Sequence, residues 1–252
     1  MGLKESGLRG SLRNVSVGID AIPDSGGDHE YHFADDENTT IVDQVGDEDL
    51  DWSDLDFISG VGVDDFIGDP PGTSGQGAAF SDNTVFPELR DGPAGTFFAT
   101  IRQDDLTPSE NNAIIATEMF TGEGTDFDFG LSTRDDGSYR FNLVLNDDGT
   151  ELEAPIPSDH EGEFVFLVGK VRDGTMFLQS ATTDDPSLTT LDSDDSPSST
   201  SNDWDDTPVF GHSPANPERA LEYPVDYSFY HPDGLADSDL QDIIDDLIPF
   251  YE

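Results

Sequence analysis

Along residues 221–252 the spacing of apolar positions changes from one periodicity to another. At first every second residue is aromatic, branched or histidine, which predicts a half-buried strand containing Tyr223, Val225, Tyr227, Phe229 and His231. After a break at 232–234, apolar residues return at helical spacing: Leu240, Ile243, Ile244, Leu247 and Ile248. We expect Asp237 to cap this helix and Pro249 to end it. The chain is therefore predicted to close with a strand, a tight break and a short amphipathic helix.

Residues 94–181 carry the clearest strand patterns. Apolar segments of strand length, most of them alternating with polar residues, recur at 95–102, 113–117, 127–131, 139–145, 164–168 and 176–178. Acidic-glycine turns separate several of these segments: Asp135-Asp136-Gly137, Asp147-Asp148-Gly149 and Arg172-Asp173-Gly174. Turns of this kind at short spacing indicate an antiparallel all-β domain.

The composition of other segments indicates the domain organisation. Residues 28–93 contain short strand patterns, and residues 182–207 are rich in Ser, Thr, Asp and Pro, which predicts an acidic loop insertion. The segment 1–27 is punctuated by glycine and ends in a hinge-like sequence. We therefore expect an N-terminal docking arm and hinge over 1–27 and one domain over 28–252.

The charge of the chain is extreme. Its 252 residues include 56 acidic and 10 basic side chains, for a formal net charge of -46. The acidic residues are spread through the periodic segments, which argues against global disorder. Molar salt would screen their repulsion, so the composition indicates a protein of a halophile or its virus. A calcium-rich extracellular setting is the alternative. Nucleic acid is an unsuitable partner, because phosphates would be repelled.

Cysteine is absent, so neither disulfides nor a cysteine nucleophile can form. No apolar run is long enough to cross a membrane, and the N-terminus lacks the apolar core of a signal peptide. We therefore expect no membrane insertion and a route to the exterior other than secretion, if the protein works outside the cell.

The first thirteen residues combine apolar and basic side chains in an otherwise acidic chain. Such an arm is suited to docking on another acidic protein, and the residues expected to dock are Leu3, Lys4, Leu8, Arg9, Leu12 and Arg13. The alternative is a frayed terminus without a partner.

The order of these elements resembles a laminin-G-like, concanavalin A-like jelly roll over residues 28–248. The resemblance is carried by His29–Phe33 with 39–43, by 75–80, by Thr96–Arg102, by the hairpin at 171–178 and by 227–240. It implies an antiparallel β-sandwich with one short C-terminal helix and an extended N-terminal arm. It also implies that the first and last strands pair, which would place His29–Phe33 beside Val225–Tyr230. The acidic loop at 182–207 and a missing tryptophan-histidine pair before Phe164 depart from the pattern.

No catalytic constellation stands out, and we expect a protein that is not an enzyme. Asp126 and Asp128 are the nearest candidates for a glycosidase pair, but the spacing to Glu123 does not fit the pattern of such families. His29 and His32 would face opposite sides of a strand, which is unsuited to joint metal binding. Cofactors are not required. Calcium is a candidate at the hairpin turns, with the ligands Asp135, Asp136, Asp147 and Asp148, although solvated turn tips are the simpler interpretation.

These observations favour an interaction module on the surface of a virion of a halophilic virus, as a capsid decoration, turret or tail-fibre component. The arm would dock on capsid or tail proteins, the assembly would be a homo-oligomer with a trimer as our guess, and a host surface glycan or glycoprotein would be the ligand. The alternatives are a carbohydrate-active enzyme and a cellular glycan-binding protein of a halophile, located outside the cell or in its cytoplasm.

Overall fold

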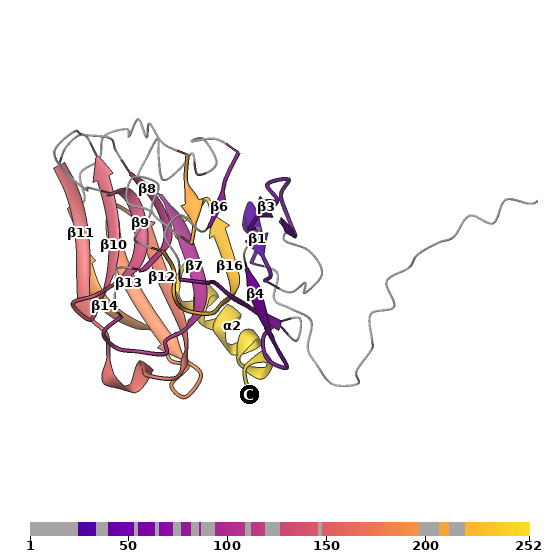
Figure 1. Ribbon diagram of the computed structural model, residues 1–252. Helices are drawn as coiled ribbons and strands as arrows, with labels where there is room; N and C mark the ends of the chain where they lie inside the picture. The colour runs from indigo at the N-terminus through magenta and orange to yellow at the C-terminus, as the bar shows by residue number, and fades with distance from the viewer. Residues whose placement is uncertain are drawn as a thin grey trace, which may run out of the picture.

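A computed structural model describes the chain at residues 25–33, 40–52, 55–63, 66–72, 77–81, 86, 94–108, 112–118, 127–145, 148–196, 207–211 and 220–252. Over these residues Figure 1 shows a β-sandwich with one α-helix, which lies near the C-terminus. Residues 1–24, which hold all six expected docking residues, lie outside the described part of the chain.

The larger sheet contains eight strands in the described residues, in the order β14-β13-β12-β7-β16-β5-β4, with β1 paired to β16. All of their pairings are antiparallel. The strands are β1 His29–Tyr31, β4 Asp56–Ser59, β5 Phe66–Asp69, β7 Gly95–Arg102, β12 Phe164–Arg172, β13 Thr175–Thr182, β14 Thr189–Asp194 and β16 Val225–His231.

The smaller sheet has six described strands in the order β11-β10-β9-β8-β15-β6. They are β6 Ala78–Ala79, β8 Asn112–Glu118, β9 Phe127–Arg134, β10 Ser138–Leu145, β11 Asp148–Pro155 and β15 Val209–Phe210. A small ribbon of β2 Thr40–Ile41 and β3 Leu50–Asp51 stands apart, and short 3₁₀ helices form at η1 Ser158–His160 and η2 Ile248–Phe250. The antiparallel jelly-roll type of sandwich expected from the sequence is confirmed.

The two ends of the domain pair as the resemblance implied. β1 lies antiparallel to β16, with Tyr31 opposite Ser228 and Glu30 opposite Phe229. The β12–β13 hairpin also forms at its expected turn, where Asp173 and Gly174 have φ angles of 51° and 78°. These positive angles are those of a two-residue turn between antiparallel strands, in which glycine carries no steric cost.

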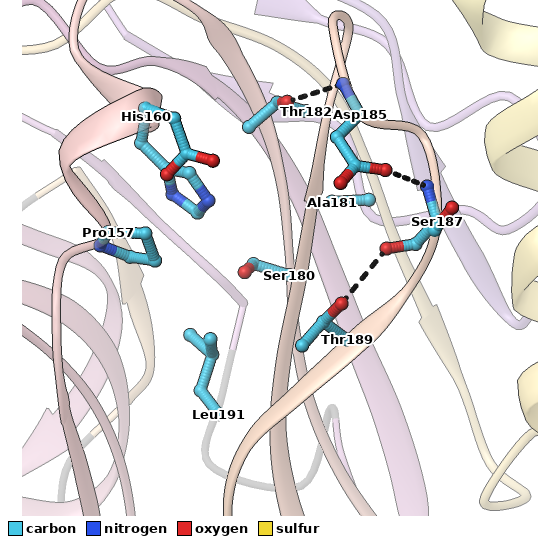
Figure 2. Close-up of a pocket in the computed structure, with 10 residues that line it drawn as sticks. Pro157, His160, Ser180, Ala181, Thr182, Asp185, Ser187, Thr189 and Leu191 are labelled. Carbon is cyan, nitrogen blue, oxygen red and sulfur yellow. Dashed lines mark hydrogen bonds between the residues drawn. The ribbon is translucent and has the colours of Figure 1, made fainter.

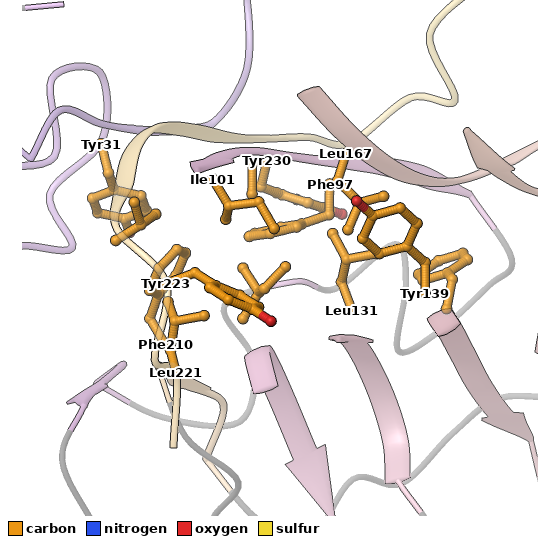
Figure 3. Packing of buried hydrophobic residues seen from close by; sticks show 14 of the residues in the cluster. Tyr31, Phe97, Ile101, Leu131, Tyr139, Leu167, Phe210, Leu221, Tyr223 and Tyr230 are labelled. Carbon is orange, nitrogen blue, oxygen red and sulfur yellow. The ribbon is translucent and has the colours of Figure 1, made fainter. Parts of the chain in front are cut away.

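The core between the sheets is aromatic. On β10 the alternate residues Tyr139, Phe141 and Leu143 are fully buried, because a strand directs every second side chain to the same face. They meet residues of the larger sheet such as Phe97 and Leu167 in one cluster, part of which is drawn in Figure 3.

A second apolar cluster covers the outer face of the larger sheet, where helix α2 (Asp237–Leu247) packs (Figure 1). The helix contributes Leu240, Ile243, Ile244 and Leu247, and the sheet contributes Phe98, Phe166, Tyr227 and Phe229. The predicted helical spacing is confirmed, and the helix gives way to η2 around Pro249.

The predicted cap of α2 was wrong. Ala236 holds the N-cap position without a side-chain hydrogen bond, and Asp237 is the first helical residue. The Asp237 carboxylate instead accepts a hydrogen bond of 2.5 Å from Nζ of Lys170, whose side chain is buried. Lys170 also donates to the Leu235 carbonyl oxygen at 3.0 Å. The ammonium group therefore ties the start of the helix to the sheet, and that partnership draws the carboxylate away from the capping position.

The acidic segment 182–207 is not wholly a loop. β14 forms within it at Thr189–Asp194 and pairs with β13 as an edge strand. Its residues alternate poorly in hydrophobicity, because an edge strand at the surface buries little of either face. Residues 197–206 of this segment lie outside the described part.

Candidate ligand-binding pocket

A cavity of about 170 Å³ opens where η1, which follows β11, approaches the β13–β14 hairpin (Figure 2). Most of the residues around it are polar and none of them is lysine or arginine: Pro157, Asp159, His160, Ser180, Ala181, Thr182, Asp185, Ser187, Thr189 and Leu191. The pocket thus joins the edges of the two sheets, near the point where the Glu153 backbone N–H of β11 donates to the Asp192 carboxylate of β14 at 3.1 Å.

The inner wall of the pocket holds a hydroxyl group without a partner. Ser180 is 2% exposed, and no hydrogen bond is found for its hydroxyl among the described residues. In Figure 2 this hydroxyl points into the space bordered by Pro157, His160 and Leu191. The hydroxyl borders the cavity, so water or a ligand that enters can bond to it.

His160 forms the opposite wall and is 6% exposed. Its Nδ1 lies 3.0 Å from the Tyr139 hydroxyl, which donates to Oε1 of Gln103 at 3.2 Å. Gln103 is oriented in turn by its own donation to the Asp105 carbonyl oxygen at 2.6 Å. Since Tyr139 has a single hydroxyl hydrogen, Nδ1 of His160 carries the proton and donates to Tyr139.

With the proton on Nδ1, Nε2 of His160 carries a lone pair and can accept a hydrogen bond. No partner for Nε2 is found in the described part of the chain. Burial lowers the pKa of His160, and the charge of Asp159 opposes that shift only in part. The imidazole is therefore neutral at neutral pH and held in one tautomer.

The outer rim of the pocket is ordered by hydrogen bonds between nearby residues of the β13–β14 turn. The Asp185 N–H donates to the Thr182 hydroxyl at 3.0 Å, and the Asp185 carboxylate accepts from the Ser187 N–H at 3.3 Å. The Thr189 hydroxyl donates to the Ser187 carbonyl oxygen at 3.2 Å. Asp159 and Asp185 are exposed, so both carboxylates can meet a ligand from solvent.

The residues singled out for calcium do not gather in this pocket. Asp135 and Asp136 lie in the exposed β9–β10 turn, where Asp136 accepts from the Ser138 hydroxyl at 2.6 Å and from Arg140 at 3.2 Å. Asp147 and the side chain of Asp148 lie outside the described part. Within that part, no three His, Asp or Glu side chains group as a metal site. Calcium at these turns stays a prediction.

The glycosidase candidates Asp126 and Asp128 cannot be placed, because Asp126 and the side chain of Asp128 lie outside the described residues.

The two histidines of the first strand have separate carboxylate partners. His29 Nδ1 lies 2.7 Å from Asp43 Oδ2, and His32 Nε2 lies 3.0 Å from Glu30 Oε1. The Asp43 carboxylate also accepts from the Glu30 and Gly46 backbone N–H groups at 3.0 Å each. Burial opposes ionisation of Asp43, but these bonds lower its pKa to about 2. The histidine network therefore braces the 43–48 turn against β1.

Sequence reasoning missed the pocket. His160 is an isolated histidine in the sequence, and Ser180, Asp185 and Thr189 fall at or after the end of a predicted strand. No sequence pattern groups these residues. They come together only in the folded domain, where β14 pairs with β13 and η1 lies beside the β13–β14 hairpin. The one available signal was the density of hydroxyl residues in 180–190.

No protein-family model matches the sequence, and no curated protein matches it. Solved structures do match. Trypanosoma rangeli sialidase in complex with the inhibitor DANA has a TM-score of 0.59 at 13% identity, over 90% of this chain and 34% of that chain. Domain 4 of AbnA, a GH43 extracellular arabinanase from Geobacillus stearothermophilus, in complex with arabinotriose, has a TM-score of 0.56 at 12% identity. That match covers 86% of this chain and 97% of the domain.

The chain has the fold of these β-sandwich domains. The binding domain of botulinum neurotoxin serotype D is a further match, with a TM-score of 0.56 at 14% identity, over 86% of this chain and 51% of that one. The chain thus spans about a third of the sialidase and about half of the neurotoxin domain. At this level of identity the similarity shows the fold alone.

The comparison corrects one expectation. Because no catalytic constellation stands out in the sequence, we expected a protein that is not an enzyme, and that inference was wrong, because a sialidase and a domain of an arabinanase are among the structures that share the sandwich. A β-sandwich of this kind is compatible with glycosidases, so whether the chain has activity depends on its own residues.

Proposed function

We propose that the chain is a glycan-binding β-sandwich module that holds a sugar in the pocket between η1 and the β13–β14 hairpin. The observation that carries the proposal is a pair of groups from residues that line the cavity, the Ser180 hydroxyl and Nε2 of His160, for which no protein partner is found in the described part of the chain. Sugars present many hydroxyl groups that both donate and accept, and a site with fixed polar groups of this kind recognises them.

The fold supports this function without establishing it. One of the similar structures, the arabinanase domain that this chain matches over 97% of its length, is in complex with arabinotriose. Pro157 and Leu191 add apolar surface to the wall of the cavity, which suits the C–H face of a sugar ring.

The proposal predicts that Ser180→Ala lowers sugar affinity at least tenfold. Alanine keeps the Cβ of serine and removes only the hydroxyl that would bond the ligand, which leaves the ligand's own group unpaired. Binding to a glycan array in molar salt identifies a ligand, and calorimetry measures the loss. Ser193→Ala on the exposed edge of β14 is the matched control and should bind as the unmodified chain does. Equal affinity of Ser180→Ala and the unmodified chain would place the ligand elsewhere.

A second candidate function is glycoside hydrolysis in the same pocket. It is favoured by two exposed carboxylates, Asp159 and Asp185, at one cavity, since glycosidases use carboxyl groups in pairs. Release of reducing sugar from a bound glycan, lost in Asp159→Asn while binding persists, would support it. Undiminished release in that variant would reject the assignment.

Further features stay predictions. Presentation on a virion, a trimeric assembly and docking of residues 1–24 on capsid or tail proteins rest on the sequence, because that segment lies outside the described part. In the described residues, no helix is both long and apolar enough to span a bilayer.

A further inference from the structure

We propose that the pocket selects an uncharged sugar ring and rejects sugars that carry a carboxylate. This inference rests on the proposed glycan-binding function and specifies its ligand class. It starts from the inventory of groups around the cavity, which includes two carboxylates and no lysine or arginine.

Three of the polar side chains around the cavity can only accept hydrogen bonds from a ligand. The Asp159 and Asp185 carboxylates accept only, and Nε2 of the neutral His160 also accepts, because its Nδ1 proton is committed to Tyr139. A neutral sugar supplies the matching donors through its hydroxyl hydrogens, and it can accept in return from a hydroxyl such as that of Ser180. A carboxylate in place of one of those hydroxyls has no proton to offer at neutral pH, so it would remove one donor and bring a like charge close to the two carboxylates.

The size of the cavity restricts the ligand further. Its volume of about 170 Å³ is below the roughly 300–1,000 Å³ of pockets that enclose drug-sized molecules. One sugar ring fits inside, and the remainder of a longer glycan would extend past the exposed Asp159 and Asp185 into solvent. The selectivity is therefore decided by the substituents of a single ring.

Two sources of repulsion must be separated. The chain as a whole has a formal net charge of -46 and repels any anion at long range at low salt. Molar salt reduces the Debye length to about 3 Å and removes that contribution, but groups in direct contact inside a pocket are screened much less. Discrimination that persists in molar salt is therefore due to the pocket.

The test uses matched pairs that differ only at C6: the methyl glycosides of glucose, galactose and mannose, each beside its uronic acid, together with the neutral uronamides. Affinities are measured by ligand-observed NMR with the full chain in molar salt. We expect at least one neutral glycoside and its uronamide to bind, and the corresponding uronic acid to bind at least tenfold more weakly. In the double variant Asp159→Asn, Asp185→Asn, that ratio should fall by about tenfold or more, because the like charges are gone.

The results of this test distinguish failure of the selectivity from failure of sugar binding. Uronic acids that bind as well as the neutral sugars, or a ratio unchanged in the double variant, would overturn the selectivity while leaving sugar binding in place. Absence of binding by every member of the panel, and by arabinotriose, would overturn the glycan-binding function itself. A circular dichroism spectrum of the double variant that matches the unmodified chain shows that the comparison is made on folded protein.

Discussion

Transfer from molar to millimolar salt is expected to unfold the β-sandwich. The chain has 56 acidic and 10 basic residues, so most carboxylates have no cationic partner. Where basic residues are present they are already shared, as at Arg140, which contacts Asp136, Glu151 and Glu153 within 3.3 Å. The Debye length grows from about 3 Å at 1 M to about 30 Å at 0.01 M. At low salt, carboxylates across the whole domain therefore repel one another.

Circular dichroism and tryptophan fluorescence measure this transition. Trp52 is 1% exposed in the folded domain, so its emission should shift to longer wavelength as the β signal is lost, and both should return when salt is restored. Trimethylamine N-oxide at equal osmolality is the control, because it is not a sugar and strengthens burial without screening charge. Identical spectra at molar and millimolar salt would reject the interpretation of the acidic surface.

Replacing Gly211 by alanine is expected to destabilise the folded domain strongly, because it combines a backbone cost with a collision in the core. Gly211 has a φ angle of 89°, which an L-residue adopts at a cost of about 1–2 kcal/mol. An added Cβ would also collide with the buried indole of Trp52, and overpacking of a core adds about 1–3 kcal/mol. The backbone cannot move away easily, because the Gly211 N–H donates to the Ile114 carbonyl at 2.8 Å and its carbonyl accepts from Leu221 at 2.7 Å.

The chain offers a matched control for that substitution. Gly60 has a φ angle of 92°, and no atom of the described chain lies within 4 Å of the position a Cβ would take. Gly60→Ala should therefore show the backbone cost alone, while Gly211→Ala shows that cost together with the collision. Denaturant unfolding in molar salt gives both free energies. Equal losses in the two variants would mean that the Trp52 packing is not as described.

The fold could be predicted largely from local patterns. The period of two in 139–145 is imposed by a core on one side of that strand, and the turn at Asp173-Gly174 fixes its hairpin by backbone geometry alone. The expectation of a half-buried strand at 225–231 was wrong, because Val225–His231 is buried on both faces, between the core and helix α2. Pairing of the first and last strands followed only from the family resemblance, since nothing local joins Tyr31 to Ser228.

Other features depended on contacts that no local pattern encodes. The local sequence predicts that Asp237 caps the helix, but in the structure its carboxylate accepts a hydrogen bond from Lys170, 67 residues earlier. β14 is a surface edge strand whose residues resemble a loop. The pocket combines both difficulties, because His160 lies in η1 and Ser180 on β13, and the two become neighbours only in the assembled sandwich.

The measurement that tests the central claim most directly is a histidine-selective ¹⁵N NMR titration with the neutral sugar that binds best. In the free protein His160 should be the neutral tautomer with the proton on Nδ1, as its bond to Tyr139 requires. Sugar should then shift its Nε2 resonance, because the ligand donates to that lone pair, and leave His29, bonded to Asp43, unchanged. A His160 resonance unmoved at saturating sugar, with shifts at another histidine, would contradict the assignment of the pocket.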